Sequence, residues 1–203
     1  MDISCIILAG GKGLRLGRNK TSQIVGGRSL LERVVSGVSF LKSEIIIVTA
    51  VGRPLTQSVS YSKLRIVDDI YPCKSSLGGI HAGLSVSNSL YNLIVACDMP
   101  FLNEALLRYM IQVSADYDLV IPRLGRFVEP LHAVYSRNCL APIEHMIKQN
   151  NLRIMQLPDL VRVRYVDAED INRFDPTHLS FFNINTEADL KRAGELAKGD
   201  TGP

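Results

Sequence analysis

The sequence predicts an α/β protein, an α/β/α sandwich of three layers in which helices cover both faces of a mostly parallel sheet. Segments with strand patterns alternate along the chain with segments whose apolar residues recur at helical spacing. Several of the strand segments are apolar from end to end, as strands buried on both faces are. Folds of this class bind ligands at the carboxyl ends of their strands.

The composition is that of one globular domain. The chain has 203 residues, 46% of them hydrophobic and 21% charged, and its net charge is only +3. This charge is too small and too dispersed to predict nucleic-acid binding. The sequence shows neither a bilayer-spanning apolar run nor a signal-like leader, so we expect a cytoplasmic protein without membrane contact. Its four cysteines lack metal-ligand spacing and are expected to be reduced thiols. Residues 1–197 are expected to form the domain and 198–203 a frayed tail.

The amino-terminal half alternates clearly between predicted strands and helices. Ser29 is placed to cap a helix that runs to about Leu41 and has one apolar face. The Pro, Ser and Gly content of 71–79 predicts a loop, with a helix from Ile80. The predicted strands are Cys5–Leu8, Ile45–Val48, Leu64–Val67 and Leu93–Ala96.

The carboxy-terminal half continues the alternation with less regular elements. Its predicted helices run from Asn103 to Ile111, from Ser136 to Ile147 and from Thr186 to Ala197. Pro142 should perturb the second helix, and Asp189 stands where a capping box places Glu or Gln. Its predicted extended segments are Leu119–Ile121 (ending at Pro122), Phe127–Tyr135, the edge strand Val161–Val166 and Phe181–Asn185.

The stretch Cys5–Lys20 joins the first predicted strand to a loop that has four glycines and carries Arg15 and Lys20. Glycine lets the backbone approach a ligand closely, free N–H groups can point at phosphate oxygens, and the cations neutralise charge. The glycine spacing fits neither a Walker loop nor the dinucleotide fingerprint. The pattern alone therefore predicts either a phosphate cradle or a strand-to-helix turn with solvated cations.

Carboxylates stand at the ends of other predicted strands. Asp98 closes an apolar strand and is placed either to coordinate a magnesium ion that also holds triphosphate oxygens or to cap the following turn. Asp68 and Asp69 either accept hydrogen bonds from a guanine edge or belong to a solvated loop. The four histidines are not spaced for zinc and no nucleophile elbow is present, so hydrolysis by an activated side chain has no support.

Five short stretches, spread over nearly the whole chain, form a pattern through their order and spacing. They are Leu8–Gly11 with Arg15–Gly17 and Lys20, Asp69 ahead of Leu77-x-Gly79, Asp98-x-Pro100, Pro130–Tyr135, and Phe182–Thr186 with Asp189–Leu190. Together they resemble the signature of Rossmann-like nucleotidyltransferases, and within these the molybdenum cofactor guanylyltransferase family. Two departures stand out: Ser75-Ser76 replaces the family's usual Gly-Pro, and Leu14-Arg15-Leu16 its common Arg-Arg-Met.

The resemblance implies a Rossmann-like nucleotidyltransferase fold and the transfer of GMP from GTP to the terminal phosphate of molybdopterin, with release of pyrophosphate. It implies Mg²⁺ as cofactor, GTP and molybdopterin as substrates, and transient contact with other cofactor-synthesis or acceptor proteins. Two alternatives stay open. One is a guanylyltransferase or cytidylyltransferase for another phosphorylated acceptor, and the other is a non-catalytic GTP-binding protein for cofactor delivery.

The resemblance also assigns site residues. Those expected to act in catalysis are Arg15, Lys20 and Asp98, with Asp98 as the metal ligand. Those expected to bind the nucleotide are Leu8, Ala9, Gly10, Gly11, Lys20, Thr49, Asp69 and Asp98. Those expected to face the acceptor are Pro130, His132, Asn183 and Asn185. Gly10 favours guanine, because cytidine-using relatives tend to have Ala at that position.

Overall fold

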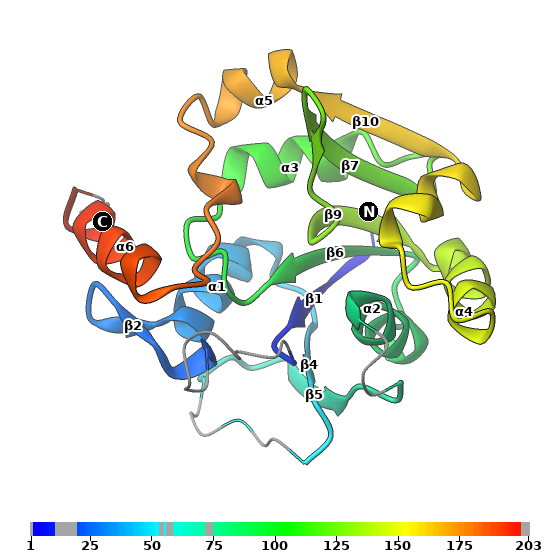
Figure 1. The fold of residues 1–203 in the computed structure, drawn as a ribbon, viewed down its shortest axis with the longest axis horizontal. Helices are drawn as coiled ribbons and strands as arrows, with labels where there is room; N and C mark the ends of the chain where they lie inside the picture. Colours follow the sequence, from blue (N-terminus) through cyan, green and yellow to red (C-terminus); the bar gives the residue numbers. More distant parts are fainter. Residues whose placement is uncertain (1, 11–19, 53–54, 56–58, 72–74, 200–203) are drawn as a thin grey trace.

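The computed structural model describes residues 2–10, 20–52, 55, 59–71 and 75–199, which form an α/β fold in three layers (Figure 1). The strands are β1 (Ile3–Leu8), β2 (Ile24–Val25), β3 (Arg28–Ser29), β4 (Ile45–Thr49), β5 (Leu64–Asp68), β6 (Tyr91–Ala96), β7 (Leu119–Leu124), β8 (Phe127–Val128), β9 (His132–Ser136) and β10 (Val163–Asp167). The α-helices are α1 (Leu30–Val38), α2 (Ser75–Val86), α3 (Glu104–Gln112), α4 (Leu140–Lys148), α5 (Ala168–Phe174) and α6 (Glu187–Gly199). Short 3-10 helices are η1 (Lys20–Ser22), η2 (Ser39–Leu41), η3 (Arg137–Cys139), η4 (Ile154–Asp159) and η5 (Leu179–Phe181).

The central sheet confirms the predicted fold class. Within the described residues it has eight strands in the order β10-β7-β9-β6-β1-β4-β5, with β8 paired to β7. Strands β6, β1, β4 and β5 are mutually parallel, and β10 is parallel to β7. Strand β9 lies antiparallel between β6 and β7, and the short β8 is antiparallel to β7. The sheet is therefore mostly parallel, and β9 joins its two parallel parts.

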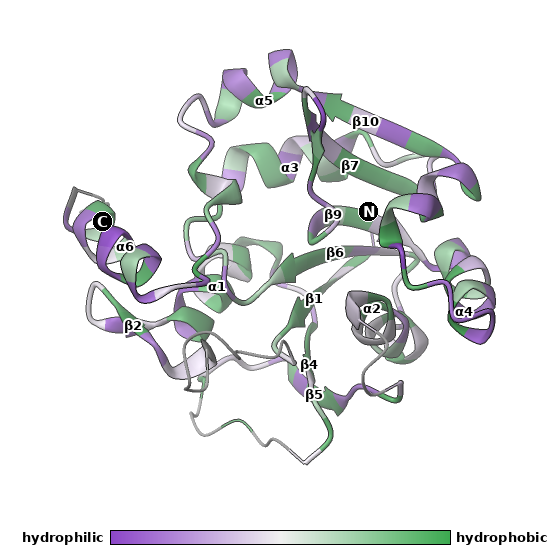
Figure 2. Cartoon of the chain, in the orientation of Figure 1, coloured by the Kyte–Doolittle hydropathy of each residue, from purple (hydrophilic) through white to green (hydrophobic). Residues whose placement is uncertain are grey.

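Helices cover both faces of this sheet. On one face, Val34 of α1, Leu107 of α3 and Ile171 of α5 belong to one buried cluster, and on the other face Ile80 of α2 and Ile143 of α4 belong to a second. Figure 2 shows hydrophobic residues along the inner strand β7 and alternating hydrophilic and hydrophobic residues along the edge strand β10. None of the described helices has the length and apolarity to span a bilayer.

The predicted helix caps are confirmed. Ser29 and Glu32 form a reciprocal capping box at the start of α1, in which Ser29 N donates to Glu32 Oε2 at 2.7 Å. Asn103 caps α3 through its side chain. At α6, Thr186 N donates to Asp189 Oδ2 at 2.8 Å and Asp189 N donates to Thr186 Oγ1 at 3.1 Å.

The predicted loop over 71–79 is wrong in its second half, because α2 begins at Ser75. The glycines that suggested a loop lie inside the helix, where they allow it to pack closely on the sheet. A Cβ on Gly79, for example, would lie 3.2 Å from Leu8 Cδ2 of β1. Ser75 itself has a φ of 58°, in the left-handed region that favours glycine. The family's usual glycine at this position therefore suits the backbone better than serine does.

Strand β7 continues beyond Pro122, where the sequence predicts it to stop, and ends at Leu124. Strand β9 pairs with β7 only at Leu119 and Val120. The carbonyl of Pro122 points to the side on which β9 pairs with Leu119 and Val120 but no longer with Pro122. It accepts a hydrogen bond from Glu129 N at 3.2 Å. Because N and O of one strand residue point to the same side, the missing N–H of proline interrupts no ladder there.

The extended segment predicted for Phe127–Tyr135 is broken by a turn at 129–131 between β8 and β9. The helix predicted from Ser136 begins with the short η3, which Ser136 caps, and α4 proper starts at Leu140. Pro142 lies in the first turn of α4, where an N–H would have no intrahelical partner, so it does not disturb the helix.

The strand predicted for Phe181–Asn185 is wrong. Its first residue ends η5, and the rest of the segment forms no strand. One main-chain hydrogen bond, from Ile184 N to Asp98 O at 2.9 Å, ties it to the loop after β6. Helix α6 extends through Gly199, into the predicted tail. Residues 200–203 lie outside the described residues.

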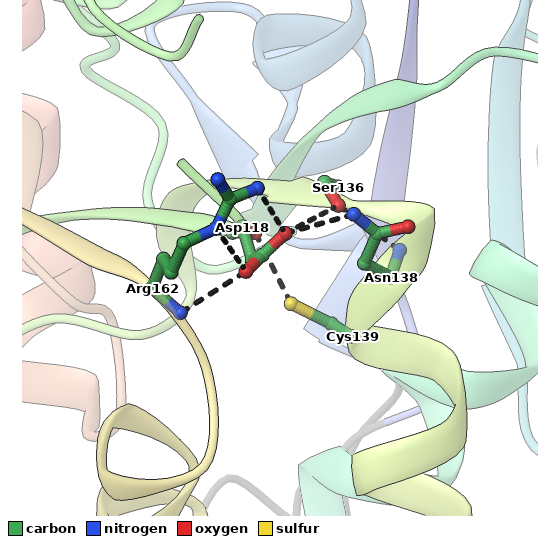
Figure 3. Close-up of polar contacts among 5 residues, drawn as sticks. All are labelled: Asp118, Ser136, Asn138, Cys139 and Arg162. Atoms are coloured by element: carbon green, nitrogen blue, oxygen red, sulfur yellow. Dashed lines mark hydrogen bonds and ion pairs between the residues drawn. The ribbon is translucent and has the colours of Figure 1, made fainter. Parts of the chain in front are cut away.

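An ion pair between the buried Asp118 and the exposed Arg162 joins β7, β9 and the residue before β10 at the amino end of β7 (Figure 3). Asp118 accepts hydrogen bonds from Arg162 N at 3.0 Å, from Arg162 Nε at 3.2 Å and from Asn138 Nδ2 at 2.9 Å. Its main-chain oxygen accepts from Ser136 N at 2.7 Å and from Cys139 Sγ at 3.1 Å. The Asp118 cluster (Asp118, Ser136, Asn138, Cys139 and Arg162) therefore binds three chain segments together.

Candidate active site

The carboxyl ends of β1, β4, β5 and β6 form one edge of the sheet, at which the predicted nucleotide residues meet. Leu8, the last residue of β1, pairs with both Val48 of β4 and Ala96 of β6, so these strands end level. Main-chain hydrogen bonds extend the pairing beyond the strands: Ala9 N donates to Val48 O at 2.8 Å, and Cys97 N donates to Leu8 O at 3.1 Å. The edge is thus a continuous, rigid backbone surface.

Gly10 lies directly against the end of β4. A Cβ at this position would be 3.0 Å from Ala50 N and 3.3 Å from Thr49 C. Even a methyl group would therefore push the start of the glycine loop away from β4. Leu8 and Ala9 are half-buried, so they and Gly10 remain within reach of a ligand at this edge.

Three of the predicted phosphate-contacting residues belong to the loop that leaves this edge. Gly11 and Arg15 lie outside the described residues. Lys20 is the first residue of η1, and its side chain is also outside the description. Because Gly10 is part of the edge, the loop begins at the ends of β1 and β4.

Asp69 lies on the far side of the same edge, directly after β5 and beside Gly78 in the first turn of α2. Its N–H donates to Thr49 O at 2.8 Å, and its Oδ1 accepts from Tyr71 N at 2.8 Å. Burial raises the pKa of Asp69, and the Tyr71 N–H only partly offsets this. Thr49 is 3% exposed and donates from Oγ1 to Asp68 Oδ1 at 3.0 Å. Thr49 is therefore placed to hold the Asp68-Asp69 turn rather than to present its hydroxyl group to a ligand.

Asp98 follows β6 and joins this edge to the carboxy-terminal part of the chain. The turn after β6 is closed by Met99 N donating to Ala96 O at 3.3 Å. Asp98 O accepts from Ile184 N, which brings residues 183–185 beside the half-buried Asp98. The Asp98 carboxylate also lies close enough to Glu129 to raise the pKa of that group.

The predicted acceptor residues occupy different environments. Pro130 and Asn183 are partly exposed, and Asn183 hydrogen-bonds to the Glu129 carboxylate. Asn185 is exposed, and its main-chain N–H donates to the α6 capping residue Asp189 at 3.0 Å.

His132 is fully buried, and its position gives no support to acceptor contact. Its ring is 0% exposed and packs edge-on against Phe181, with 5.1 Å between ring centroids. Burial lowers the pKa of His132 to about 4, which the charge of Asp175 only partly opposes. Neither ring nitrogen has a hydrogen-bond partner in the part of the chain that the structure describes. A ring without accessible surface cannot touch a dissolved acceptor.

A cavity of about 470 Å³ lies elsewhere, between α1, the loop after Pro100 and the end of α6. It is lined by Arg28 and Arg33 together with residues of η5 and its approach, and by none of the predicted site residues. The cavity is therefore separate from the strand-end site.

Comparison with known proteins gives the family to which this strand-end site belongs. The sequence model of the MobA-like NTP transferase domain matches residues 5–163. The chain belongs to this family. The match begins within β1 and ends at the first residue of β10, so it includes most of the central sheet.

Relatives of the MobA-like chain extend the similarity over nearly its full length. A probable molybdenum cofactor guanylyltransferase from Pelotomaculum thermopropionicum is 36% identical over 95% of this chain and 92% of its own. A molybdenum cofactor guanylyltransferase from Desulfosudis oleivorans is 36% identical over 97% and 96%. The crystal structure of molybdopterin-guanine dinucleotide biosynthesis protein A from Archaeoglobus fulgidus superposes with a TM-score of 0.81 at 31% identity, covering 97% and 99% of the two chains.

Nucleotidyltransferases of this kind generally use a divalent metal ion. Among the described residues, no three His, Cys, Asp or Glu side chains gather as a metal-binding group. A structural zinc site requires such a group, whereas Mg²⁺ binds through one or two carboxylates and completes its shell with phosphate oxygens and water. Asp98, with Glu129 close by, supplies oxygen ligands of the kind that Mg²⁺ prefers.

Glu129 is the residue of this site that the sequence argument missed. It is 7% exposed, lies close to Asp98 and hydrogen-bonds to Asn183. The available signal was its place immediately before Pro130-Leu131, as an acid inside an otherwise extended and mostly apolar segment. An isolated acid in such a segment usually faces solvent, which is why the pattern did not single it out.

Proposed function

We propose that this protein transfers GMP from GTP to the terminal phosphate of molybdopterin, forming the guanine dinucleotide cofactor and releasing pyrophosphate. The observation that carries the proposal is the position of Asp98. It stands at the strand-end edge that includes Gly10 and Asp69, and its main chain is bonded to the Asn183–Asn185 segment. A nucleotide at this edge and an acceptor at that segment would meet at Asp98. The names of the full-length relatives give the same activity.

The nucleotide half of the proposed site is the edge from Leu8 to Asp69. The close approach of Gly10 to β4 would leave room for the base and ribose beside the backbone. Asp69, whose carboxylate is held by the Tyr71 N–H, would accept hydrogen bonds from the guanine edge or the ribose. Arg15 and Lys20, through the glycine loop, would neutralise the triphosphate.

Asp98 would hold Mg²⁺ together with oxygens of the triphosphate. Two neighbouring carboxylates, Asp98 and Glu129, repel one another in a partly buried site, and a divalent cation relieves this repulsion. When bound, the ion would supply charge neutralisation for the phosphate groups. The residues present thus fit Mg²⁺, with Asp98 as the protein ligand.

The chemistry needs little from the side chains beyond positioning and charge. An oxygen of the terminal phosphate of molybdopterin attacks the α-phosphorus of GTP, and the bond from that phosphorus to the bridging oxygen of the β-phosphate breaks. The attacking oxygen is already anionic, so no proton has to be removed. Arg15 and Lys20 would stabilise the charge that gathers on the departing pyrophosphate.

We infer that the enzyme acts in the cytoplasm. The thiols of Cys5, Cys97 and Cys139 are buried and form no disulfide among the described residues, and reduced thiols suit a reducing compartment.

The test is incubation of the protein with Mg²⁺ and GTP, CTP or ATP, each with and without molybdopterin. We expect pyrophosphate only with GTP plus molybdopterin. Pyrophosphate with CTP plus molybdopterin would contradict the base assignment drawn from Gly10. GTP that is bound but remains intact in the presence of molybdopterin would instead support a non-catalytic delivery protein.

A further inference from the structure

The cavity of about 470 Å³ between α1, the loop after Pro100 and the end of α6 has no role in the proposed reaction. Its volume is within the range of pockets that hold small organic ligands. Segments that are distant in the sequence form its walls, namely 28–37, 100–103 and 175–179, together with Leu196 of α6. The fold therefore builds a hollow of ligand size where these segments meet.

The charge that this cavity presents to a ligand is positive. Arg28, the exposed first residue of β3, and the partly exposed Arg33 of α1 both line it. Among the described lining residues the only carboxylate is that of Asp175, which is 4% exposed. Its Oδ1 accepts from Leu179 N at 3.2 Å and its Oδ2 accepts from Ser180 N at 2.9 Å, so main-chain N–H groups already hold its charge. A ligand in the cavity would therefore meet two guanidinium groups and little of the carboxylate.

Arg33 is fixed in place by contacts on two sides. Its Nε donates to Val25 O of the β2–β3 hairpin at 2.6 Å. Its guanidinium group also lies over the ring of Phe101, 5.7 Å from the ring centroid. The planar guanidinium group matches the geometry of a phosphate group, and one that is already ordered loses little further entropy when an anion binds. The cavity thus has a preorganised cation in its wall.

The rest of the lining is largely apolar, and its apolar side chains are Pro100, Phe101, Leu102, Leu179 and Leu196. Leu102 lies tightly against α1, because a Cβ on Gly37 would be 3.2 Å from Leu102 Cβ. Phe101 is supported by the edge-on ring of Phe182, with 6.0 Å between the ring centroids. These contacts make the 100–103 wall a firm apolar surface, against which the body of a ligand would be removed from water.

We propose that this cavity is a second ligand site, which binds a small phosphate monoester whose phosphate is attached to an apolar or aromatic body. Arg28 and Arg33 bind the phosphate group, and the body packs on the wall formed by Phe101 and Leu102. The site is separate from the strand-end site, so its existence does not depend on the proposed reaction.

The probe for this site is phenyl phosphate, titrated into the ¹⁵N-labelled full chain and followed through the assigned backbone amide signals. We expect the signals of Gly37, Leu102 and Thr177 to shift with one Kd on the order of 1 mM, the affinity of a well-placed fragment of this size. Shifts at Ala9 and Asp69 with none at the cavity residues would place the probe at the strand-end site and overturn the proposal. Cavity signals that stay unchanged at about 10 mM probe would overturn it as well.

Two variants test the proposed contacts. Arg28→Ala removes one guanidinium group, and Ser36→Glu places a negative charge at an exposed lining position of α1. Each should raise the Kd of phenyl phosphate about tenfold, the effect of one lost or opposed charged contact. The matched control is Arg153→Ala, an exposed arginine outside the cavity, which should leave the Kd within about twofold because distant surface charges are screened. Equal effects of Arg153→Ala and Arg28→Ala would reveal unspecific attraction to surface charge and contradict the site.

Two further ligands separate the phosphate group from the apolar body. Inorganic phosphate lacks the ring and benzyl alcohol lacks the charge, so each should bind at least about tenfold more weakly than phenyl phosphate, judged by the same signals. Equal binding of inorganic phosphate would contradict the role of the apolar wall, and equal binding of benzyl alcohol would contradict the role of the arginines. Circular dichroism and the Tm establish that each variant is folded. Arg33 is left unchanged because its bond to Val25 O holds the β2–β3 hairpin to α1.

Discussion

Asp118 and Glu129 are two buried carboxylates next to β9, one near each end of that strand. The fold shifts their pKa values in opposite directions. Their exposure is almost equal, at 8% and 7%. For Asp118, the penalty of burial is outweighed by hydrogen bonds from Arg162 and Asn138 and by the charge of Arg162, so its pKa is lowered. For Glu129, burial and the nearby charge of Asp98 outweigh its hydrogen bonds, so its pKa is raised.

The difference teaches that burial alone does not distinguish a structural acid from a functional one. The protein supplies Asp118 with its own cation, Arg162, and the resulting cluster fastens β7 to β9 (Figure 3). It places Glu129 beside a second acid, Asp98, so that the local charge is most easily balanced by what binds there. The first arrangement stabilises the fold, and the second fits a site for a metal ion and phosphates.

The largest effect that would test this contrast is expected from Asp98→Ala. We expect turnover to fall by on the order of a hundredfold or more, because the proposed metal ligand is lost. The free energy of unfolding should change by less than about 0.5 kcal/mol, since the change removes a charge that repels Glu129. Pyrophosphate release and urea unfolding of the same sample measure both. Near-normal turnover with Mg²⁺ would show that Asp98 is not the ligand.

His132 is the third buried titratable group of this region, and it should give the fold a distinct pH dependence. Its pKa in the folded protein is about 4, below its ordinary value, so only the unfolded chain takes up this proton at mildly acidic pH. Stability should therefore fall as the pH drops from about 6.5 to about 4, by roughly 3 kcal/mol in total from this group.

The His132→Phe variant isolates that contribution, because phenylalanine can keep the edge-on contact with Phe181 and does not titrate. The difference in unfolding free energy between wild type and variant should change across this pH window and level off above it. A difference that is constant with pH would contradict the buried, neutral state of His132.

A smaller loss of stability is expected from Asp118→Asn. Removing the charge while keeping the shape should lower the unfolding free energy at pH 7 by about 1 kcal/mol, because Arg162 is exposed to solvent, with turnover per folded molecule unchanged. The sign of the pH effect follows from the lowered pKa. The contribution of Asp118 is present at neutral pH and is lost as the pH falls through its folded-state pKa, so wild type and variant should converge in acid. A loss of turnover without a loss of stability would reverse the roles assigned to the two acids.

The smallest effect, and the only stabilising one, is expected from Ser75→Gly. Ser75 has a φ of 58°, and relief of this left-handed strain should outweigh the greater entropy of a glycine chain by about 0.5 kcal/mol. Thermal unfolding detects such a change, and Ser76→Gly, at a position without a left-handed φ, is the matched control. Equal shifts in the two variants would show that strain at Ser75 is not the cause.

Much of the fold is predictable because its signals are local. The apolar runs of β1, β4 and β6 predict buried strands, and the caps at Ser29, Asn103 and Thr186 mark the starts of helices correctly. The predictions that fail depend on distant contacts. The glycines before Ile80 look like a loop until the sheet that they pack against is known. Similarly, Phe181–Asn185 has the composition of a strand but pairs with no strand in the described part of the chain.

The same difference between local signals and distant contacts applies to the candidate site. Gly10, Asp69 and Asp98 could be predicted because strand ends meet at one edge of a parallel sheet. The proximity of Glu129 to Asp98 could not be predicted, because the fold brings these two residues together from separate segments. The expectation that His132 faces the acceptor finds no support in its burial, for a related reason. Its motif suggests the acceptor side, whereas the direction of its side chain depends on which face of β9 it occupies.

The position of β9 in the sheet has a consequence for the order in which the chain assembles during synthesis. By the time Cys97 has been made, the strands β1, β4, β5 and β6 are all present and adjacent, and the edge of β6 is open. Strand β7 is made next, but its neighbours in the sheet, β8, β9 and β10, all come later. The open edge of β6 is therefore a pairing surface that waits for β9, and until then it is exposed to other chains. The strands that carry the proposed nucleotide half of the site can therefore assemble before the acceptor half has been made, and β9 later joins them to β7 and β10.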